Sequence, residues 1–385
     1  MRIGPTTRPA GEAVIVLLAS MTMAAYGSWI YAFGVLLDDL VADLGAREGA
    51  LVAAFGAAQL LAGVGSVIAG RTLDRRGSTP VFLGGAFGAV ILGSSALATT
   101  PLAFSVLYAI GSGFVGACGF YHISQTCASR LFPGRETHAI TRLTLYAAFS
   151  SPVFYPLTAW LVQRGGWQLG VTVAAAMTAV LFLAAIGAAP TPPTDREGSH
   201  RLTIDGFRGP ARRYALGVII ATGTVQVLSV YQVPVMVASG LALGTASTLA
   251  GARGIAQFLG RLPLARLAAR FGAAPALRVS IAMLAVGTGM LAFSDSVVMA
   301  GAAMLITGLA IGAQSPLVGI RGREVFDERV LGTALGTVTL GTFVAGAVTP
   351  VAAGALVEAS GTRLAAVALG VAVAVLATII VGGDR

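Results

Sequence analysis

The sequence has no lysine and little charge of either sign. Charged residues make up 11% of the chain, whereas a soluble protein typically carries about 25%. This shortage excludes an ordinary soluble domain, whose surface requires more charge. Cysteine is also scarce, and both Cys118 and Cys127 fall in one apolar segment. The sequence therefore predicts two small packing residues and no disulfide framework.

Histidine is almost as rare, with three in the whole chain. His122 has no second His, Asp or Glu that would share its helix face, and no Ser-His-acid set is visible. The sequence therefore predicts no metal site, no cofactor and no enzymatic activity. A membrane-embedded sensor is a further alternative, but it would normally carry a soluble domain, and no segment here is long enough for one.

Apolar residues dominate what is present. They make up 56% of the chain, the mean hydropathy is +0.84, and runs of roughly 20 apolar residues recur throughout. Such runs predict a polytopic membrane protein, and because they are continuous rather than alternating, they predict helices and not a barrel. We expect twelve transmembrane helices, at about 13–37, 49–70, 80–98, 102–129, 138–162, 167–189, 213–238, 245–266, 275–294, 297–320, 331–357 and 362–382.

The arginines fix an expected orientation. The net charge of +9 does not indicate nucleic-acid binding, because the arginines sit in short turns between apolar runs. With twelve spans, nearly all of them fall on one side of the membrane, and only Arg47, Arg164 and Arg363 fall on the other. The positive-inside rule then predicts that both termini are cytoplasmic, in a bacterial-type inner membrane.

The spans divide into two halves. A polar stretch rich in proline and arginine at 190–212 separates six spans in residues 1–189 from six in residues 213–385. The halves also repeat weakly, since Leu73–Gly77 aligns with Ala268–Gly272 in the second half. Six spans restore the starting orientation, so we expect two six-helix bundles related as a parallel repeat.

The charged turn Gly70–Gly77 carries a family resemblance. Its sequence, Gly-Arg-Thr-Leu-Asp-Arg-Arg-Gly, resembles the loop between the second and third helices of major facilitator superfamily transporters. The resemblance covers essentially the whole chain, although Ser78 and Thr79 replace the two basic residues that usually follow. It implies that Asp74, Arg75 and Gly77 form a conformational latch; the plain alternative is a solvated turn that marks topology.

Arg253 is the most informative residue within a span. It lies near the expected midplane of the eighth span, where an arginine costs about 2.5–3.5 kcal/mol and should face a cavity or a partner. A guanidinium pairs well with a carboxylate. Through Tyr31–Val35 and Arg130–Pro133, the chain more narrowly resembles bacterial monocarboxylate-porter-like members. This resemblance implies that Arg253 holds a substrate carboxylate; the alternative is a structural arginine that caps carbonyls or snorkels outward.

Other polar and aromatic residues complete the predicted substrate site. His122 could bind substrate or take a coupling proton, or could be a neutral histidine satisfied by a nearby carbonyl. Gln125 and Gln257 could line a cavity or join helices. Tyr31 and Tyr231 occupy matching positions in the two halves, and we expect both in central helices.

These features predict a secondary transporter that works by alternating access. The expected substrate is a small organic anion, most simply a carboxylate, with possible proton symport. The alternative is an efflux pump for amphipathic or drug-like compounds, which a midplane arginine disfavours when the compound is cationic. The expected partners are this small molecule, a proton and the lipid bilayer, with no nucleic acid, and the expected unit is a monomer.

Overall fold

The computed structural model describes residues 8–189, 191–192, 207–262, 268, 270–327 and 330–382. All regular structure in these residues is helical, and they contain no strand. Most of the predicted linker at 190–212 lies outside the described residues, as does the end of the predicted eighth span.

The first half contains a run of helices that match the first six predicted spans. They are α1 (Arg8–Tyr26), the π-helix η1 (Gly27–Tyr31), α2 (Ala32–Leu44), α3 (Glu48–Arg76), α4 (Ser78–Ser94), the 3₁₀-helix η2 (Ser95–Leu97), α5 (Pro101–Gly119), α6 (Tyr121–Leu131), α7 (Glu136–Ala147) and α8 (Ser150–Ala188).

The second half contains the helices of the remaining six spans. They are α9 (Pro210–Ala238), α10 (Leu243–Arg261), α12 (Ala273–Met290), the 3₁₀-helix η4 (Leu291–Phe293), α13 (Val297–Val325), α14 (Leu331–Ser360) and α15 (Leu364–Val381).

Ten helical segments of the described chain are long and apolar enough to cross a membrane. One of them, Glu136–Ala188, makes two crossings, because Gly165 and Gly166 inside α8 have non-helical backbone angles. The remaining crossing is α10, which contains two arginines and is not among the ten. With that break and with α10, the helices follow the predicted order of twelve.

Helix ends follow from local sequence. Gly45 ends α2 and Gly361 ends α14, both in the left-handed conformation that glycine adopts at little cost. Thr100 begins α5, where its side chain accepts a hydrogen bond from the Ala103 N–H at 3.3 Å and Pro101 follows at the first helical position. The turns at these three positions are therefore well specified by the sequence.

The two halves use the same helix pairings. In the first half α3 and α4 both pack against α5, and in the second half α10 and α12 both pack against α13. These are corresponding helices of the two halves, as a parallel repeat requires. Contacts between the halves come mainly from α3 with α14, α8 with α10, and α2 with α9.

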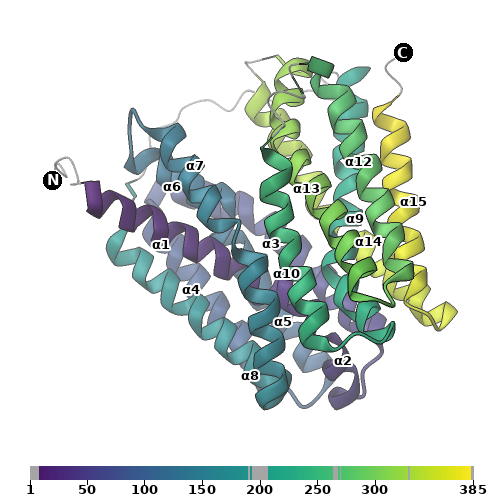
Figure 1. Ribbon diagram of the computed structural model, residues 1–385. Helices are drawn as coiled ribbons and strands as arrows, with labels where there is room; N and C mark the ends of the chain where they lie inside the picture. Colours follow the sequence, from purple (N-terminus) through teal and green to yellow (C-terminus); the bar gives the residue numbers. More distant parts are fainter. Residues whose placement is uncertain are drawn as a thin grey trace.

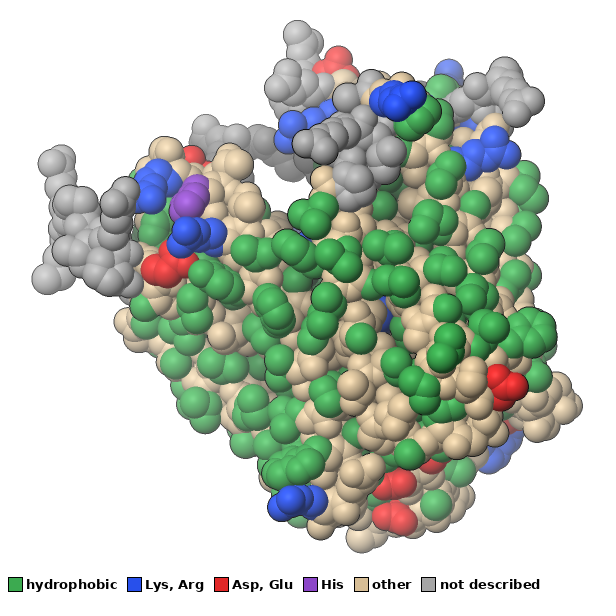
Figure 2. Space-filling model, in the orientation of Figure 1, with side chains coloured by type: hydrophobic (Ala, Val, Ile, Leu, Met, Phe, Trp, Pro, Cys, Tyr) green, Lys and Arg blue, Asp and Glu red, His purple; other side chains and the backbone are tan. Residues whose placement is uncertain are grey.

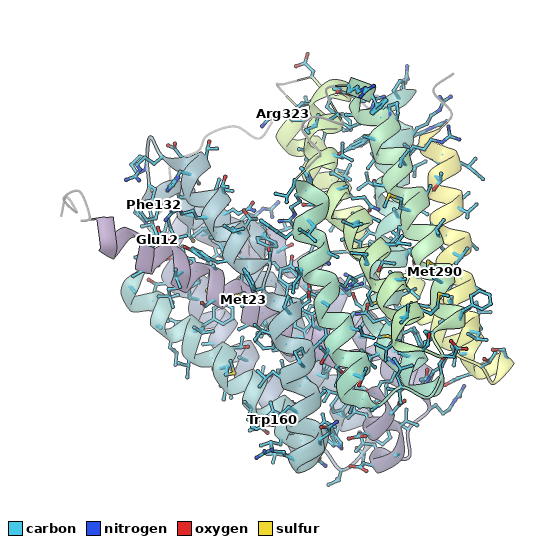
Figure 3. All side chains as sticks on the ribbon, viewed as in Figure 1. Glu12, Met23, Phe132, Trp160, Met290 and Arg323 are labelled. Atoms are coloured by element: carbon cyan, nitrogen blue, oxygen red, sulfur yellow. The ribbon has the colours of Figure 1, made fainter. Side chains whose placement is uncertain are left out.

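The two ends of the molecule differ in how closely the halves approach. Both chain termini lie at one end, here called the terminal end, and α2 runs to the opposite end, here called the closed end (Figure 1). Figure 2 shows the halves separated at the terminal end and in contact toward the closed end. Glu12 of the first half and Arg323 of the second half, both labelled in Figure 3, lie on opposite sides of this separation.

Candidate functional site

The centre of the candidate site is Arg253 on α10. Its side chain is 1% exposed, and its Nε and Nη1 groups have no hydrogen-bond partner among the described residues. The helix α13 passes close by: a Cβ added at Gly308 would lie 2.6 Å from the Arg253 carbonyl oxygen. Arg253 is therefore a buried cation with unsatisfied donors, held against the second-half bundle.

Two tyrosines of the first half face Arg253. The guanidinium acts electrostatically on the hydroxyls of Tyr31, at the end of the π-helix η1, and of Tyr155 on α8. The rings of these tyrosines lie 5.3 Å apart. Tyr155 also receives a hydrogen bond from the Gln232 side chain of α9. Arg253 therefore lies where helices of both halves meet, as a substrate site between two rocking bundles requires.

The π-helix η1 shapes the first-half side of this meeting point. A π-turn inside a long helix often marks a functional site, and this one separates α1 from α2 and ends at Tyr31. Tyr26 precedes it and stacks on Phe120, with ring centroids 4.0 Å apart. Phe120 also stacks at 6.4 Å on Phe343 of α14, in the other half. An aromatic wall thus continues from α1 to the second half.

Gln257 shares a helix face with Arg253, because it lies four residues further along α10. Its side chain is half-buried, and its backbone lies against α13, where a Cβ at Gly312 would overlap it. Arg261, four residues further again, continues the same face, and its Nε is buried without a hydrogen-bond partner among the described residues. The structure therefore brings Arg253, Gln257 and Tyr31 into one region.

His122 lies just after a break between α5 and α6, where Phe120 has an extended backbone. Its Nε2 lies 3.0 Å from the Ala117 carbonyl oxygen, which can accept a hydrogen bond from it. This is the arrangement expected of a neutral histidine that satisfies a free carbonyl at a helix end. The side chains of His122 and Gln125 are both half-buried on α6. Among the described residues neither side chain forms a hydrogen bond with Arg253, so the structure does not join them to that residue.

Tyr231 lies in a different place from Tyr31, although the two positions match in the repeat. It is 2% exposed, and Glu48, Arg363 and Glu358 act electrostatically on its hydroxyl. A Cβ added at Gly354 of α14 would lie 3.4 Å from that hydroxyl. The structure therefore places Tyr231 with a charged cluster at the closed end rather than beside Arg253.

The closed-end cluster consists of Asp38, Arg47, Glu48, Glu358 and Arg363. Arg363 forms ion pairs with Asp38 and, at 2.9 Å, with Glu48. Arg47 forms an ion pair with Glu358, which also accepts a hydrogen bond from the Gly49 N–H. Each pair joins the first half to the second half. Figure 2 shows acidic side chains gathered at this end.

The predicted latch residues lie at the terminal end. Asp74 forms an ion pair with Arg130 of α6, and Arg130 also donates to the Leu73 carbonyl oxygen at 3.2 Å. Arg75 is exposed. Gly77 has a φ of 79° between α3 and α4, a conformation that strongly favours glycine. Asp74 is therefore paired within its own half in this conformation.

Sequence reasoning missed Tyr155 and the closed-end cluster, and it indicated Gln232 only as a buried amide in need of a partner. Tyr155 and Gln232 are polar residues in the middle of apolar spans, a signal that was visible but did not reveal their partners. In the closed-end cluster, Asp38 lies inside α2, Arg47 and Glu48 lie where α3 begins, and Glu358 and Arg363 lie where α14 ends. Among the residues that the structure describes, no group of three or more His, Cys, Asp or Glu could hold a metal ion.

Comparisons with known proteins agree with this architecture. The family model described as Major Facilitator Superfamily matches residues 17–213 and 214–383. The crystal structure of the nucleoside transporter NupG shares 16% identity, with 97% of this chain and 100% of that chain covered and a TM-score of 0.78. No curated protein sequence matches the chain.

Two further solved structures have the same fold. The D-xylose-proton symporter shares 16% identity, with 97% of each chain covered and a TM-score of 0.77. A bacterial homolog of the human lysosomal transporter Spinster, in an inward-facing and unoccupied conformation, shares 14% identity, with 97% of each chain covered and a TM-score of 0.76. The family model covers nearly the whole chain, and the chain therefore belongs to the major facilitator superfamily of transporters.

Proposed function

We propose that this transporter moves a small organic anion, a carboxylate, and that Arg253 holds it. One observation carries the proposal: a fully buried guanidinium whose Nε and Nη1 lack acceptors among the described residues. A buried donor without a partner costs about 1–3 kcal/mol, and more when it is charged. A carboxylate would satisfy two of these donors at once and neutralise the charge.

The surroundings of Arg253 favour an anion over a cation. The hydroxyl of Tyr31 is a neutral group that can donate a hydrogen bond to a carboxylate beside the guanidinium. The Tyr155 hydroxyl already donates to the Ser229 carbonyl oxygen at 3.5 Å. The acidic side chains described in the spans lie toward the two ends of the bundle. A cationic compound at the centre would meet Arg253 without a nearby countercharge, which disfavours the alternative of cation efflux.

Alternating access explains why Arg253 lies between the halves. Ion pairs join the halves at the closed end, and the halves separate at the terminal end (Figure 2). The positive-inside rule assigns the terminal end to the cytoplasm of a bacterial-type inner membrane. On that assignment the present conformation is open to the cytoplasm, and transport requires the closed-end pairs to break.

We also propose that transport is coupled to a proton carried by His122. The hydrogen bond from Nε2 to the Ala117 carbonyl leaves Nδ1 free to take a proton without losing that bond. His122 is half-buried on α6. It follows Tyr121, whose ring centroid lies 5.5 Å from that of Tyr26 in the aromatic wall. A substrate-dependent pH change in everted vesicles, absent in His122→Asn, would test the coupling separately from anion binding.

Uptake into proteoliposomes tests the main proposal. We expect labelled short-chain monocarboxylates to accumulate with the intact chain and uptake to fall at least about tenfold in Arg253→Gln, the equivalent of losing one charge-assisted contact. Arg212→Gln is the matched control, because Arg212 is exposed on α9 and its removal changes the net charge equally. Unchanged anion uptake in monodisperse Arg253→Gln would overturn the proposal.

A further inference from the structure

A second arginine extends the site along α10. Arg261 lies eight residues after Arg253, which places it two turns and about 12 Å further toward the terminal end. Arg253, Gln257 and Arg261 follow one another at intervals of four residues and therefore form one stripe on the helix. This arginine stripe is the feature from which the inference starts.

Arg261 resembles Arg253 in having an unsatisfied donor. Its side chain is half-buried, and its Nε is buried without a hydrogen-bond partner among the described residues. The ion pairs found among these residues involve other arginines. Arg261 is more accessible than Arg253 because it lies nearer the end at which the halves separate.

Both arginines lie near the same aromatic residues of the first half. Arg253 and Arg261 each act electrostatically on the hydroxyl of Tyr31, so Tyr31 lies within range of both. Arg261 acts on Tyr121 of α6 as well. Tyr26 bridges these tyrosines, with ring centroids 6.3 Å from Tyr31 and 5.5 Å from Tyr121. The stripe of donors therefore runs opposite a row of aromatic rings.

This arrangement has two positive charges and no described carboxylate partner for either. A substrate with one anionic group would satisfy the donors of one arginine and leave those of the other unmatched. A substrate with an anionic group at each end would satisfy both, while its apolar body would lie against the aromatic row. Such pairing of several anchors is worth more than a single contact, because the second anchor binds within an already formed complex.

We propose that the substrate is a dianion with two separated anionic groups, a dicarboxylate in which one carboxylate binds Arg253 and the other binds Arg261. The inference rests on the proposed function, since Arg253 must hold an anion for Arg261 to hold a second one. Gln257 lies between the two anchors and supplies an amide donor to the body of the substrate or to either carboxylate.

Binding to the full chain purified in detergent tests this assignment. The probes are α,ω-dicarboxylates of about four to eight carbons, chosen for a separation of about 12 Å between the two Cα atoms, and monocarboxylates of equal length. We expect at least one dicarboxylate to bind about tenfold or more tightly than its matched monocarboxylate. In Arg261→Gln this preference should vanish, while monocarboxylate affinity changes less than about twofold.

Three further variants separate failure of this inference from failure of the proposed function. Arg253→Gln should weaken both classes of probe at least about tenfold, and Arg212→Gln should leave both unchanged. Arg261→Lys, which keeps the charge, should retain part of the dicarboxylate preference. If Arg261→Gln weakens both classes equally, or neither, while Arg253→Gln abolishes binding, the dianion assignment is overturned and the proposed function stands. If Arg253→Gln binds both classes normally, the proposed function itself is wrong.

Discussion

The two ends of the molecule use ion pairs differently. At the closed end the pairs join the halves: Arg363 to Asp38 and Glu48, and Arg47 to Glu358. At the terminal end the described pairs stay within one half, namely Asp74 with Arg130, Glu12 with Arg142, and Arg321 with Glu324. Ion pairs therefore connect the two halves at the closed end and stay within one half at the terminal end.

This difference decides which pairs influence alternating access. A pair within one half can move with its bundle and contributes equally to both conformations, so its free energy cancels from the equilibrium between them. A pair between the halves exists only while that end is closed, so its whole free energy favours the closed conformation. Mutations at the two ends should therefore have different consequences, even when each removes one ion pair.

Arg363→Gln should have the largest effect on this equilibrium. Arg363 is one-fifth exposed and bonds both Asp38 and Glu48, and hydrogen bonds to charged groups contribute about 1.5–3 kcal/mol when partly buried. We expect a loss of about 2 kcal/mol from the closed end, or roughly a 30-fold change in the ratio of the two conformations. Spin labels at exposed Thr99 and Asp295, in turns of the two halves at this end, would report a longer distance.

Arg47→Gln is the matched control for Arg363→Gln. It also removes an arginine that pairs across the halves, but Arg47 is 81% exposed, and exposed pairs contribute little because water screens them. The labels should therefore report a smaller shift than with Arg363→Gln. Equal shifts for the two variants, or none with Arg363→Gln, would show that the closed-end cluster does not hold this end shut.

Gly34→Ala should open the closed end by a steric route and with an intermediate effect. A Cβ added at Gly34 on α2 would lie 2.5 Å from the carbonyl oxygen of Val230 on α9, in the other half. Backbone cannot rotate away as a side chain can, so α2 and α9 must separate, at a cost of at least about 1 kcal/mol. The same pair of spin labels should report the separation.

Gly70→Ala controls for the general effect of replacing glycine in a helix. Nothing lies within 4 Å of a Cβ added at Gly70 on α3, so this variant should leave the label distances unchanged and raise helix stability by about 0.5–1 kcal/mol. If Gly34→Ala behaves like Gly70→Ala, the halves do not depend on close packing between α2 and α9.

The fold was predictable because the membrane imposes a local rule. A helix must keep its apolar run continuous over the bilayer thickness, so span order and helix ends such as Gly45 and Gly361 are visible in the sequence. The burial of Arg253 could be predicted in the same way, because the apolar run that contains it places it near the midplane of the membrane. Its role with substrate stays a prediction.

The partners within the site were not predictable, because they depend on how helices rotate and cross. Tyr155 and Gln232 meet from α8 and α9, and no sequence spacing links those helices. The repeat suggested equivalent roles for Tyr31 and Tyr231, but the charges around them differ: Arg253 and Arg261 face one, and Glu48 faces the other. The sequence shows a second arginine, Arg261, eight residues after Arg253. Because Arg261 lies at the end of the span, the positive-inside rule already accounted for it, and a role in the site was not predicted.

Asp74→Asn should have the smallest effect, and in the opposite direction. The pair with Arg130 lies within the first half, and Asp74 is 45% exposed, so the loss of this pair should cancel between conformations. The hypothesised latch, with Asp74 facing a helix N-terminus of the other half, would exist only when the terminal end is closed and would contribute about 0.3–1 kcal/mol. Its loss should shift the equilibrium about two- to fivefold toward the present conformation.

Labels at exposed Gly134 and Arg323, across the terminal end, would measure this shift as a larger fraction of long distances. Glu12→Gln provides the control, because it breaks the pair with Arg142 inside the same half without touching Asp74, and it should leave the fraction unchanged. If both variants shift the fraction equally, Asp74 acts only as another pair within its own half. A shift with Asp74→Asn alone would instead show that Asp74 forms a contact between the halves in only one of the two conformations. In that respect Asp74 would act at the terminal end as the closed-end cluster acts at the other end.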